Sequence, residues 1–435
     1  MILDKTIKTP LYLQIYQYYK EAILHQDIKA KEKLPSIRSL SLKHSLSKTT
    51  IEKAYNQLLI EGYIESYPKS GYYVSSLSVL NQIKPTIAKK KVTQKAFINE
   101  FQDKNSFNIP LLKRCFQDVL HYQSDLLFKP LNPQGEQALK LEIHKHLIEE
   151  RGVVCEADQI VIASGIQNQL MSIASLTSKR RVAYLVPLFI RAKQLFELLN
   201  FEMIPCHSID EMLLVNPDFF YLSPSNLYPS GEVLPISARL KLIQYAEQSH
   251  AYIIEDDYNH IFRYNAALIP SIQGLSKGNH VIYIGSFSRN LLISMRISYM
   301  VLPPNLISAY QEKVKLAQTV SMVDQLALAL FMKEGYYKKH LRKLSHDSKK
   351  HNEGIQAILE RYPFNTDFVR ISGLESNLHV LFKITNQTYF DTIKTRAKAQ
   401  RIYIQTFEEM PHYILLPYSN IPLETFKSLL QNLFH

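Results

Sequence analysis

Short apolar stretches alternate with amphipathic helical stretches through the middle of this 435-residue chain, and this alternation constrains the fold more than any other feature. We expect strands at 159–163, 182–186, 219–222, 252–254 and 281–284, and helices at 166–177, 189–199 and 236–248. Buried strands that alternate with helices are typical of a mostly parallel sheet covered by helices on both faces. The sequence therefore predicts an α/β fold for the larger part of the chain.

Residues 10–76 carry a different pattern, that of a small unit with three helices and a hairpin. Ser36 follows a proline and is a good N-cap for the second helix. Thr49, with Glu52 three residues later, predicts a capping box at the start of the third. Two short aromatic-rich strands flank the turn residues 68–71, as in a β-hairpin. This order predicts a winged helix-turn-helix.

Positive charge is concentrated at the same end of the chain. Residues 1–95 carry fifteen Lys and one Arg against seven acids, which gives +9 of the total net charge of +12. Residues 77–97 hold several lysines and no acid, and they are expected to form a basic linker. A basic end on a nearly neutral body indicates a polyanionic partner, although a solvated lysine-rich surface would give the same charge.

Seven residues of the small unit are candidates for contacting duplex DNA. A recognition helix presents short polar and basic side chains at its N-terminus, and a hairpin with lysine and glycine can approach the DNA backbone. Helix capping or simple solvation is the better explanation of each candidate when it is taken alone. Together with the fold pattern, they predict DNA binding by Arg38, Ser47, Lys48, Thr49, Thr50, Lys69 and Gly71.

Residues 10–76 resemble the winged-helix domain of the GntR family. The resemblance rests on Leu-Pro-Ser-Ile-Arg-Ser-Leu at 34–40, Ser-Lys-Thr-Thr-Ile at 47–51, Glu-Gly-Tyr-Ile at 61–64 and Gly-Tyr-Tyr-Val at 71–74. The family commonly has arginine where Lys48 stands, and some members have a basic residue in place of Glu52. Lysine keeps the charge but loses the bidentate contact with guanine, so a family operator sequence does not transfer to this chain.

Residues 131–305 resemble the fold-type-I aminotransferase half of MocR-type regulators, which follows a GntR head. The matching runs include Asn-Pro-Gln-Gly at 132–135, Glu-Asp-Asp-Tyr at 255–258, Phe-Arg-Tyr at 262–264 and Gly-Ser-Phe-Ser at 285–288. The resemblance implies a pocket for pyridoxal phosphate. It places Asp256 at the pyridine nitrogen and Tyr258 at the ring hydroxyl, and it places the remaining contacts, to the phosphate and the ring face, at Ser286, Ser288, Arg296 and Phe189.

The sequence departs from the family pattern at the residue that would bind the cofactor covalently. Relatives have lysine after Phe-Ser, and this chain has Arg289. A guanidinium group stays protonated near neutral pH and does not form an imine. The substrate-carboxylate arginine is also missing, because 413–418 reads Tyr-Ile-Leu-Leu-Pro-Tyr. Ile166, Asn226-Leu227 and the run at 186–189 differ as well. We therefore expect no covalent pyridoxal phosphate, weak non-covalent binding at most, and an approach of Arg289 to Asp256 or an ion.

These observations predict a winged helix-turn-helix at 1–76, the linker at 77–97, and an aminotransferase-like dimerisation and effector domain at 98–435. The function expected is that of a cytoplasmic, homodimeric transcriptional regulator that binds operator DNA, senses a small molecule and is not an enzyme. A pyridoxal-phosphate aminotransferase with an accessory DNA-binding head is the alternative, and a body that only dimerises is a third. Three widely spaced cysteines argue against a disulfide framework or a zinc site, and no apolar run reaches the ~20 residues of a membrane span.

Overall fold

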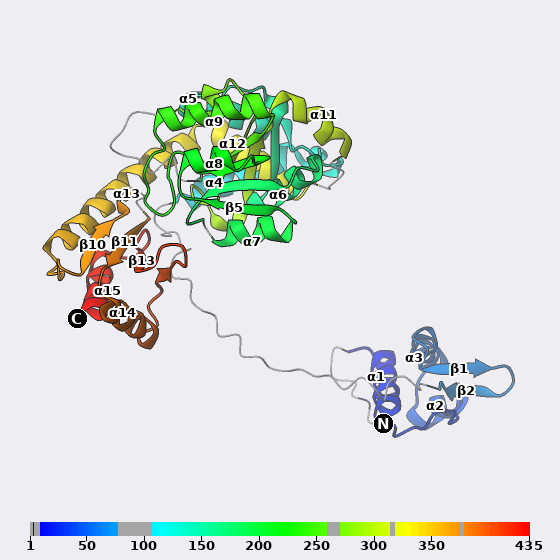
Figure 1. Cartoon of the computed structure of the whole chain (residues 1–435). Helices are drawn as coiled ribbons and strands as arrows, with labels where there is room; N and C mark the ends of the chain where they lie inside the picture. The colour runs from blue at the N-terminus through cyan, green and yellow to red at the C-terminus, as the bar shows by residue number, and fades with distance from the viewer. Residues whose placement is uncertain are drawn as a thin grey trace. The chain divides into compact units, whose positions relative to one another are not determined.

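The computed structural model describes Leu3 and residues 9–76, 107–188, 190–258, 270–313, 318–374 and 378–435. The chain divides into two compact units, Met1–Gln94 and Lys95–His435, which are described separately here (Figure 1). The expected linker at 77–97, Phe189 and the 262–264 motif lie outside the described residues. The domain boundaries expected at 76 and 97 therefore stay predictions.

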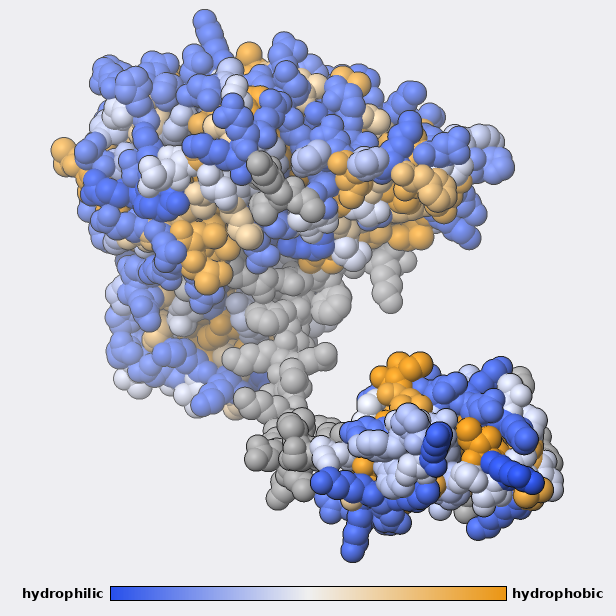
Figure 2. All heavy atoms as spheres, turned by 90° about the vertical axis from the view of Figure 1, so that its right-hand side faces the viewer, coloured by the Kyte–Doolittle hydropathy of each residue, from blue (hydrophilic) through white to orange (hydrophobic). Residues whose placement is uncertain are grey.

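The first unit contains the three helices and the hairpin expected from the sequence. Helices α1 (Leu11–Leu24), α2 (Ile37–His44) and α3 (Lys48–Ile60) precede strands β1 (Ile64–Tyr67) and β2 (Gly71–Val74), which pair antiparallel. Their apolar faces form one core that includes Ile15, Tyr19, Leu40, Ile51, Tyr55, Leu58, Ile64 and Val74. Leu42 and Ile60 are among the exposed apolar side chains of this unit. Figure 2 shows small hydrophobic patches among hydrophilic residues on its surface.

Side-chain caps fix where α2 and α3 begin. Ser36 caps α2 as expected, because its hydroxyl accepts a hydrogen bond from the Ser39 amide. The expected cap at Thr49 is wrong. Ser47 caps α3 by accepting from the Thr50 amide at 3.2 Å, and Thr49 lies in the first helical turn. The N-cap therefore lies two residues earlier than the Thr49–Glu52 spacing predicts.

A mixed seven-stranded sheet forms the centre of the described part of the second unit. Its strand order is β3-β9-β8-β7-β6-β4-β5, and every neighbouring pair is parallel except those that involve β9. The five strands expected from the sequence are β3 (Ile160–Ser164), β4 (Arg181–Leu185), β6 (Phe219–Leu222), β7 (Tyr252–Asp256) and β8 (Val281–Ser286). The sequence did not predict β5 (Glu202–Cys206) or the antiparallel β9 (Ile297–Val301).

Helices cover both faces of this sheet, which confirms the expected α/β fold (Figure 1). Alternate strand residues such as Val161, Phe219 and Ile282 pack on one face against α6 (Gly165–Leu176), α7 (Ile190–Leu198) and α11 (Pro304–Lys313). The other face packs against α4 (Ile109–Tyr122), α5 (Gln137–Arg151), α8 (Ile209–Leu214), α9 (Ile236–Ser249), α10 (Ile272–Leu275) and α12 (Met322–Lys333).

The C-terminal part of the second unit adds a smaller antiparallel sheet. Its order is β10-β11-β13-β12, with β10 (Val369–Ser372), β11 (His379–Ile384), β12 (Gln405–Thr406) and β13 (Tyr413–Pro417). Three helices pack with it: α13 (Tyr336–Arg361), α14 (Gln387–Ala399) and α15 (Leu423–Phe434). Among the described helices, none is long and apolar enough to cross a membrane.

Candidate functional site

The DNA-contact candidates of the first unit lie on two helix starts and one turn. Arg38 is the second residue of α2 and is exposed, and Lys48 and Thr49 are exposed in the first turn of α3. Ser47 and Thr50 have a structural role, because their hydroxyls bond to each other at 2.7 Å while Ser47 caps the helix. Arg38, Lys48 and Thr49 thus present side chains that the helix caps do not use.

The hairpin turn brings a cation that sequence reasoning missed. Lys69 and Gly71 both have positive φ, at 62° and 111°, and Lys69 is exposed. A Cβ on Gly71 would lie 3.3 Å from Cε of Lys33, so a larger residue there would crowd this side chain. The Lys33 ammonium lies 5.7 Å from the centre of the Tyr73 ring, within the range of a cation–π interaction. The local sequence around Lys33 does not mark it as a DNA-contact candidate. It comes next to β2 only in the folded unit, where Lys33 forms a β-bridge with Tyr73.

The second group of candidates gathers where the parallel strands β6, β7 and β8 end. Asp256 is the last residue of β7, and its carboxylate accepts a hydrogen bond of 2.5 Å from the Tyr221 hydroxyl of β6. Burial, with a smaller contribution from the charge of Asp257, raises the pKa of Asp256 to about 6, against the opposing effects of the Tyr221 hydrogen bond and the charge of Arg289. The carboxyl ends of parallel strands are where open α/β sheets bind their ligands.

Arg289 is near both Asp256 and Tyr258. Its guanidinium carbon lies 5.6 Å from the centre of the Tyr258 ring, a cation–π geometry. Burial raises the pKa of the Tyr258 hydroxyl to about 12, and the charge of Arg289 acts in the opposite direction. A permanent cation therefore lies over the aromatic residue that was expected to contact a cofactor ring.

The expected phosphate contacts lie at the end of β8 and at the start of α6. Ser286 ends β8, and its hydroxyl accepts from the Ser288 amide at 3.1 Å. Arg296 is exposed, and its guanidinium lies so close to Gly165 that a Cβ there would meet Nη2 at 2.5 Å. Gly165 is the first residue of the twelve-residue helix α6. A helix N-terminus beside an arginine is an arrangement that suits an anion.

A buried polar network behind these strand ends was missed from the sequence. Arg151, at the end of α5, donates to Asp257 at 2.6 and 3.3 Å and to the Ser225 hydroxyl at 2.7 Å. The Tyr283 hydroxyl donates to the same carboxylate at 2.5 Å. The side chains of Arg151 and Asp257 are 3% and 0% exposed. Their signal was the doubled acid at 256 and 257, since successive strand residues point to opposite faces.

The C-terminal sheet also reaches this site. Nε2 of His379, on β11, lies 2.6 Å from the Pro229 carbonyl oxygen and donates to it in the neutral imidazole. Burial, with a smaller contribution from the charge of Arg289, lowers the pKa of His379 to about 4, against the opposing effect of the hydrogen bond to Pro229. Its ring packs edge-on against Tyr228. Asn226 nearby in sequence is 3% exposed, and among the described residues its amide has no hydrogen-bond partner.

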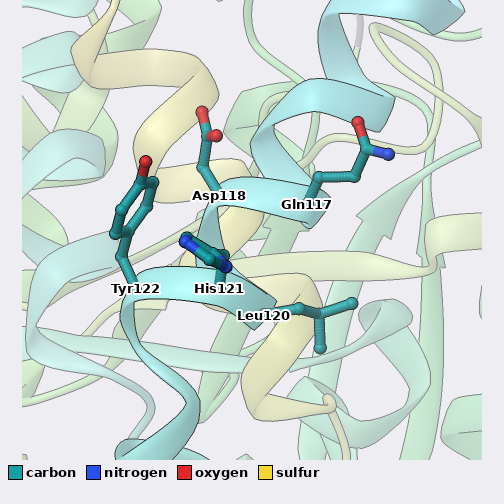
Figure 3. Close-up of a pocket in the computed structure, with 5 residues that line it drawn as sticks. All are labelled: Gln117, Asp118, Leu120, His121 and Tyr122. Carbon is teal, nitrogen blue, oxygen red and sulfur yellow. The ribbon is translucent and has the colours of Figure 1, made fainter.

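A separate hollow of about 460 Å³ lies on the outer surface of α4, lined by Gln117, Asp118, Leu120, His121 and Tyr122 (Figure 3). None of the expected cofactor contacts lines it. Leu120 and Tyr122 are 53% and 76% exposed and line the hollow together with three polar residues. Within the described part of the chain, no cluster of three or more His, Cys, Asp or Glu side chains could hold a metal ion.

The residues at the strand ends fit pyridoxal phosphate only in part. Asp256, Tyr258 and Arg296 have the chemistry that its ring nitrogen, ring hydroxyl and phosphate require. The group over the pocket, however, is the guanidinium of Arg289, and residues 286–300 include no lysine. A covalent imine at this position does not fit the donor set.

Two protein families match consecutive parts of the chain. Residues 11–74 match the bacterial regulatory proteins of the gntR family, and residues 98–377 match aminotransferase class I and II. The HTH-type transcriptional regulator YhdI of Bacillus subtilis (strain 168) is 35% identical over 400 residues, which cover 88% of this chain and 85% of that protein. The probable rhizopine catabolism regulatory protein MocR of Rhizobium meliloti is 25% identical, covering 100% and 95%.

Solved structures share the fold of the second unit. The kynurenine aminotransferase of Pyrococcus horikoshii matches with a TM-score of 0.68 at 18% identity, covering 77% of this chain and 88% of that one. A multiple-substrate aminotransferase from Thermococcus profundus matches with a TM-score of 0.67 at 19% identity, covering 77% and 89%. At this identity the likeness shows the fold alone.

Proposed function

This chain belongs to the MocR-type HTH transcriptional regulators, in which a GntR winged helix precedes an aminotransferase class I and II domain, and we propose that its aminotransferase-like part binds a small ligand without covalent pyridoxal phosphate and catalyses no transamination. The observation that carries the proposal is the guanidinium of Arg289 over the ring of Tyr258. It occupies the position at which the family resemblance requires an imine-forming lysine.

The chemistry of the pocket supports a non-covalent ligand. Pyridoxal phosphate, when it is bound covalently, supplies an electron sink that needs a deprotonated amine on the protein. Arg289 cannot provide that amine, because a guanidinium stays charged near neutral pH. Asp256, Arg289 and Arg296 instead hold charges that bind and orient an ionic ligand, and Tyr258 offers an aromatic face beside them.

A spectroscopic experiment tests this proposal. Wild-type protein mixed with pyridoxal phosphate should show no internal-aldimine absorbance and no borohydride-trapped adduct at residue 289. Pyridoxine phosphate, which lacks the aldehyde, should bind with an affinity within a few-fold of that of pyridoxal phosphate. Arg289→Lys is the matched variant and should regain the absorbance band. A wild-type protein that converts an amino acid and a keto acid would establish the alternative, a working aminotransferase.

The chain is a DNA-binding regulator, and we propose Arg38, Lys48 and Thr49 as its principal DNA contacts. Arg38→Ala or Lys48→Ala should weaken operator binding by about 1–3 kcal/mol if the side chain reads a base. Lys29→Ala, an exposed lysine outside the candidate set, is the control and should leave affinity nearly unchanged. Unaltered affinity and salt dependence in both test variants would contradict the assignment.

We also propose that the second unit forms a homodimer through the apolar surface of α4 and the turn that follows it. Leu120, Tyr122 and Phe128 are 53%, 76% and 90% exposed, and closely spaced exposed apolar side chains are typical of an interface. Light scattering should give twice the chain mass at micromolar concentration. Phe128→Asp should shift the protein toward monomer, whereas Leu214→Asp, equally exposed on α8, should not. A wild-type monomer would refute the proposal.

A further inference from the structure

Helix α13 (Tyr336–Arg361) carries a row of exposed cations that no role proposed so far uses. Figure 1 shows it as a long helix at the outside of the second unit, beside the sheet of β10, β11 and β13. Between residues 338 and 350 it contains six lysines and arginines and one acid, Asp347. All six cations are exposed: Lys338, Lys339, Arg342, Lys343, Lys349 and Lys350. We call these six residues the basic face of α13.

The six cations lie on one side of the helix. With about 100° of rotation per residue, they fall within an arc of about 140°, and Asp347 lies outside it. At about 1.5 Å of rise per residue, the arc extends for about 18 Å along the helix axis. Glu353, also exposed, lies in line with the arc but beyond Lys350. The basic face therefore consists of two groups of cations, 338–343 and 349–350, that lie on the same side of the helix about 9 Å apart along its axis.

The net charge of the basic face is more positive than the net charge of residues 96–435 as a whole. The basic face and Asp347 together carry +5, whereas residues 96–435 carry only +3. The rest of the body is thus slightly acidic, and the positive potential is concentrated on one helix. Lys338 pairs with Glu149 at 2.9 Å. Within the described ranges, no carboxylate lies at ion-pair distance from Lys339, Arg342, Lys349 or Lys350.

Buried residues anchor α13 in the protein on either side of the basic face, whereas no residue between 338 and 351 is buried. Tyr337, Ile355 and Leu359 are buried, and the Tyr418 hydroxyl donates to the buried Asn352 amide oxygen at 2.5 Å. A Cβ on Gly354 would meet Leu423 of α15 at 2.7 Å, which shows how closely the two helices pack. The basic face is presented on a fixed support, so its ordering entropy is already reduced before any partner binds.

We infer that the basic face of α13 binds the phosphate backbone of duplex DNA and is a second DNA-contact surface of the regulator, in addition to the winged helix. The inference rests on the DNA-binding function of the chain. A row of lysine and arginine contacts phosphates without reading sequence. Because both surfaces belong to one chain, DNA held by the winged helix is present at a high effective concentration for the basic face.

Charge and packing together favour DNA over an anionic membrane. Helices that bind at membrane surfaces need an apolar side that enters the lipid. The buried apolar residues of α13 are unavailable, because Ile355 and Leu359 pack in the core of the C-terminal sheet and Tyr337 packs in a core of the larger sheet. The basic face offers only polar contacts, which suit a phosphate backbone.

The experiment uses the full-length chain and a mixed-sequence duplex of about 60 base pairs, long enough to contact the winged helix and further protein surface. The test variant is Lys339→Gln/Arg342→Gln/Lys349→Gln/Lys350→Gln. The control carries the same number of neutralised charges on other exposed positions, Lys383→Gln/Lys394→Gln/Lys398→Gln/Lys427→Gln. Affinity is measured over a range of salt concentrations for both variants and for wild type.

Each lost phosphate contact reduces the slope of log affinity against log salt by about 0.9, so four contacts change it by about 3.6. Between 50 and 200 mM salt, the wild type should then lose roughly 100-fold more affinity than the test variant. The control should stay close to wild type. Acetylation of Lys339, Lys349 and Lys350 by a lysine reagent should also slow when the duplex is bound.

The inference is overturned if the test variant behaves like the control and DNA leaves the acetylation rates unchanged. It is also overturned if anionic vesicles or single-stranded RNA protect these lysines and the duplex does not. The variant Arg38→Ala/Lys48→Ala distinguishes a failure of the second DNA-contact surface from a failure of the DNA contacts proposed for the winged helix. If this variant loses DNA affinity while the α13 variant does not, only the second surface is wrong. If neither variant loses affinity, the DNA contacts proposed for the winged helix fail as well.

Discussion

Arg151→Met is expected to destabilise the second unit strongly, because it leaves the buried Asp257 carboxylate without its cation. Removing one partner of a buried ion pair typically costs about 3–5 kcal/mol of unfolding free energy. Tyr283 still donates a hydrogen bond of 2.5 Å to Asp257, so we expect the lower end of that range, about 3 kcal/mol. Ser225 also loses the Arg151 donor.

Urea unfolding followed by far-UV circular dichroism at pH 8 measures this loss; the chain contains no tryptophan. Arg114→Met is the control, since its pair with Asp118 is exposed and 3.8 Å long and should contribute less than about 1 kcal/mol. Asp257→Asn should destabilise the wild type but stabilise Arg151→Met, because it removes the uncompensated charge and keeps an acceptor for Tyr283. The reasoning is refuted if Arg151→Met costs under about 1 kcal/mol or if Asp257→Asn destabilises both backgrounds.

Three further predictions concern the pH dependence, the pocket wall and the winged helix. Burial raises the pKa of Asp256 from 3.8 to about 6, so the stability that the protonated carboxyl contributes at low pH is lost as pH rises through this window. Asp256→Asn does not titrate, so in urea unfolding its free energy of unfolding should rise relative to that of wild type between about pH 4 and 7. A difference that stays constant with pH would contradict this. Gly165→Ala, at a φ of +76°, places a Cβ 2.5 Å from the guanidinium of Arg296, the exposed end of a flexible side chain that can move away. Its melting temperature should therefore fall about as much as that of Gly152→Ala, which has positive φ and open space; a much larger fall would show that Arg296 is held in place. Ser47→Ala should cost the winged helix about 1 kcal/mol in thermal unfolding and Ser47→Asn much less, since asparagine is also a good N-cap; equal effects would exclude the capping role.

Local chemistry made the winged helix predictable from the sequence. The Ser36 cap and the turn at 68–71 follow from residue types within a few positions of each other, and both are confirmed. The start of α3 was misplaced because Ser47 and Thr49 are both capping residues. The choice depends on which hydroxyl reaches an amide of the first turn, and that hydroxyl belongs to Ser47.

Long-range pairing explains what the sequence could not reveal about the body. Five of the six parallel strands were visible as apolar stretches and β5 was missed, whereas the place of β9 between β3 and β8 depends on partners far away in sequence. The family motifs located Asp256, Tyr258 and Arg289. The contacts of Arg151 with Asp257, 106 residues apart, and of His379 with Pro229, 150 residues apart, depend on the complete fold; the doubled acid at 256 and 257 is a local pattern, but it does not identify Arg151 as the partner.

The antiparallel strand β9 also determines when β3 can join the larger sheet during synthesis of the chain. Among the described strands, β3 pairs only with β9, and 135 residues separate the paired Ala163 and Ser298. At about 5–20 residues per second, a ribosome needs roughly 10 s to supply that partner. During this interval the apolar strand β3 has an unpaired edge, a period in which a nascent chain is open to chaperones and to aggregation. The winged helix, which has its own core, is complete before β3 is even synthesised.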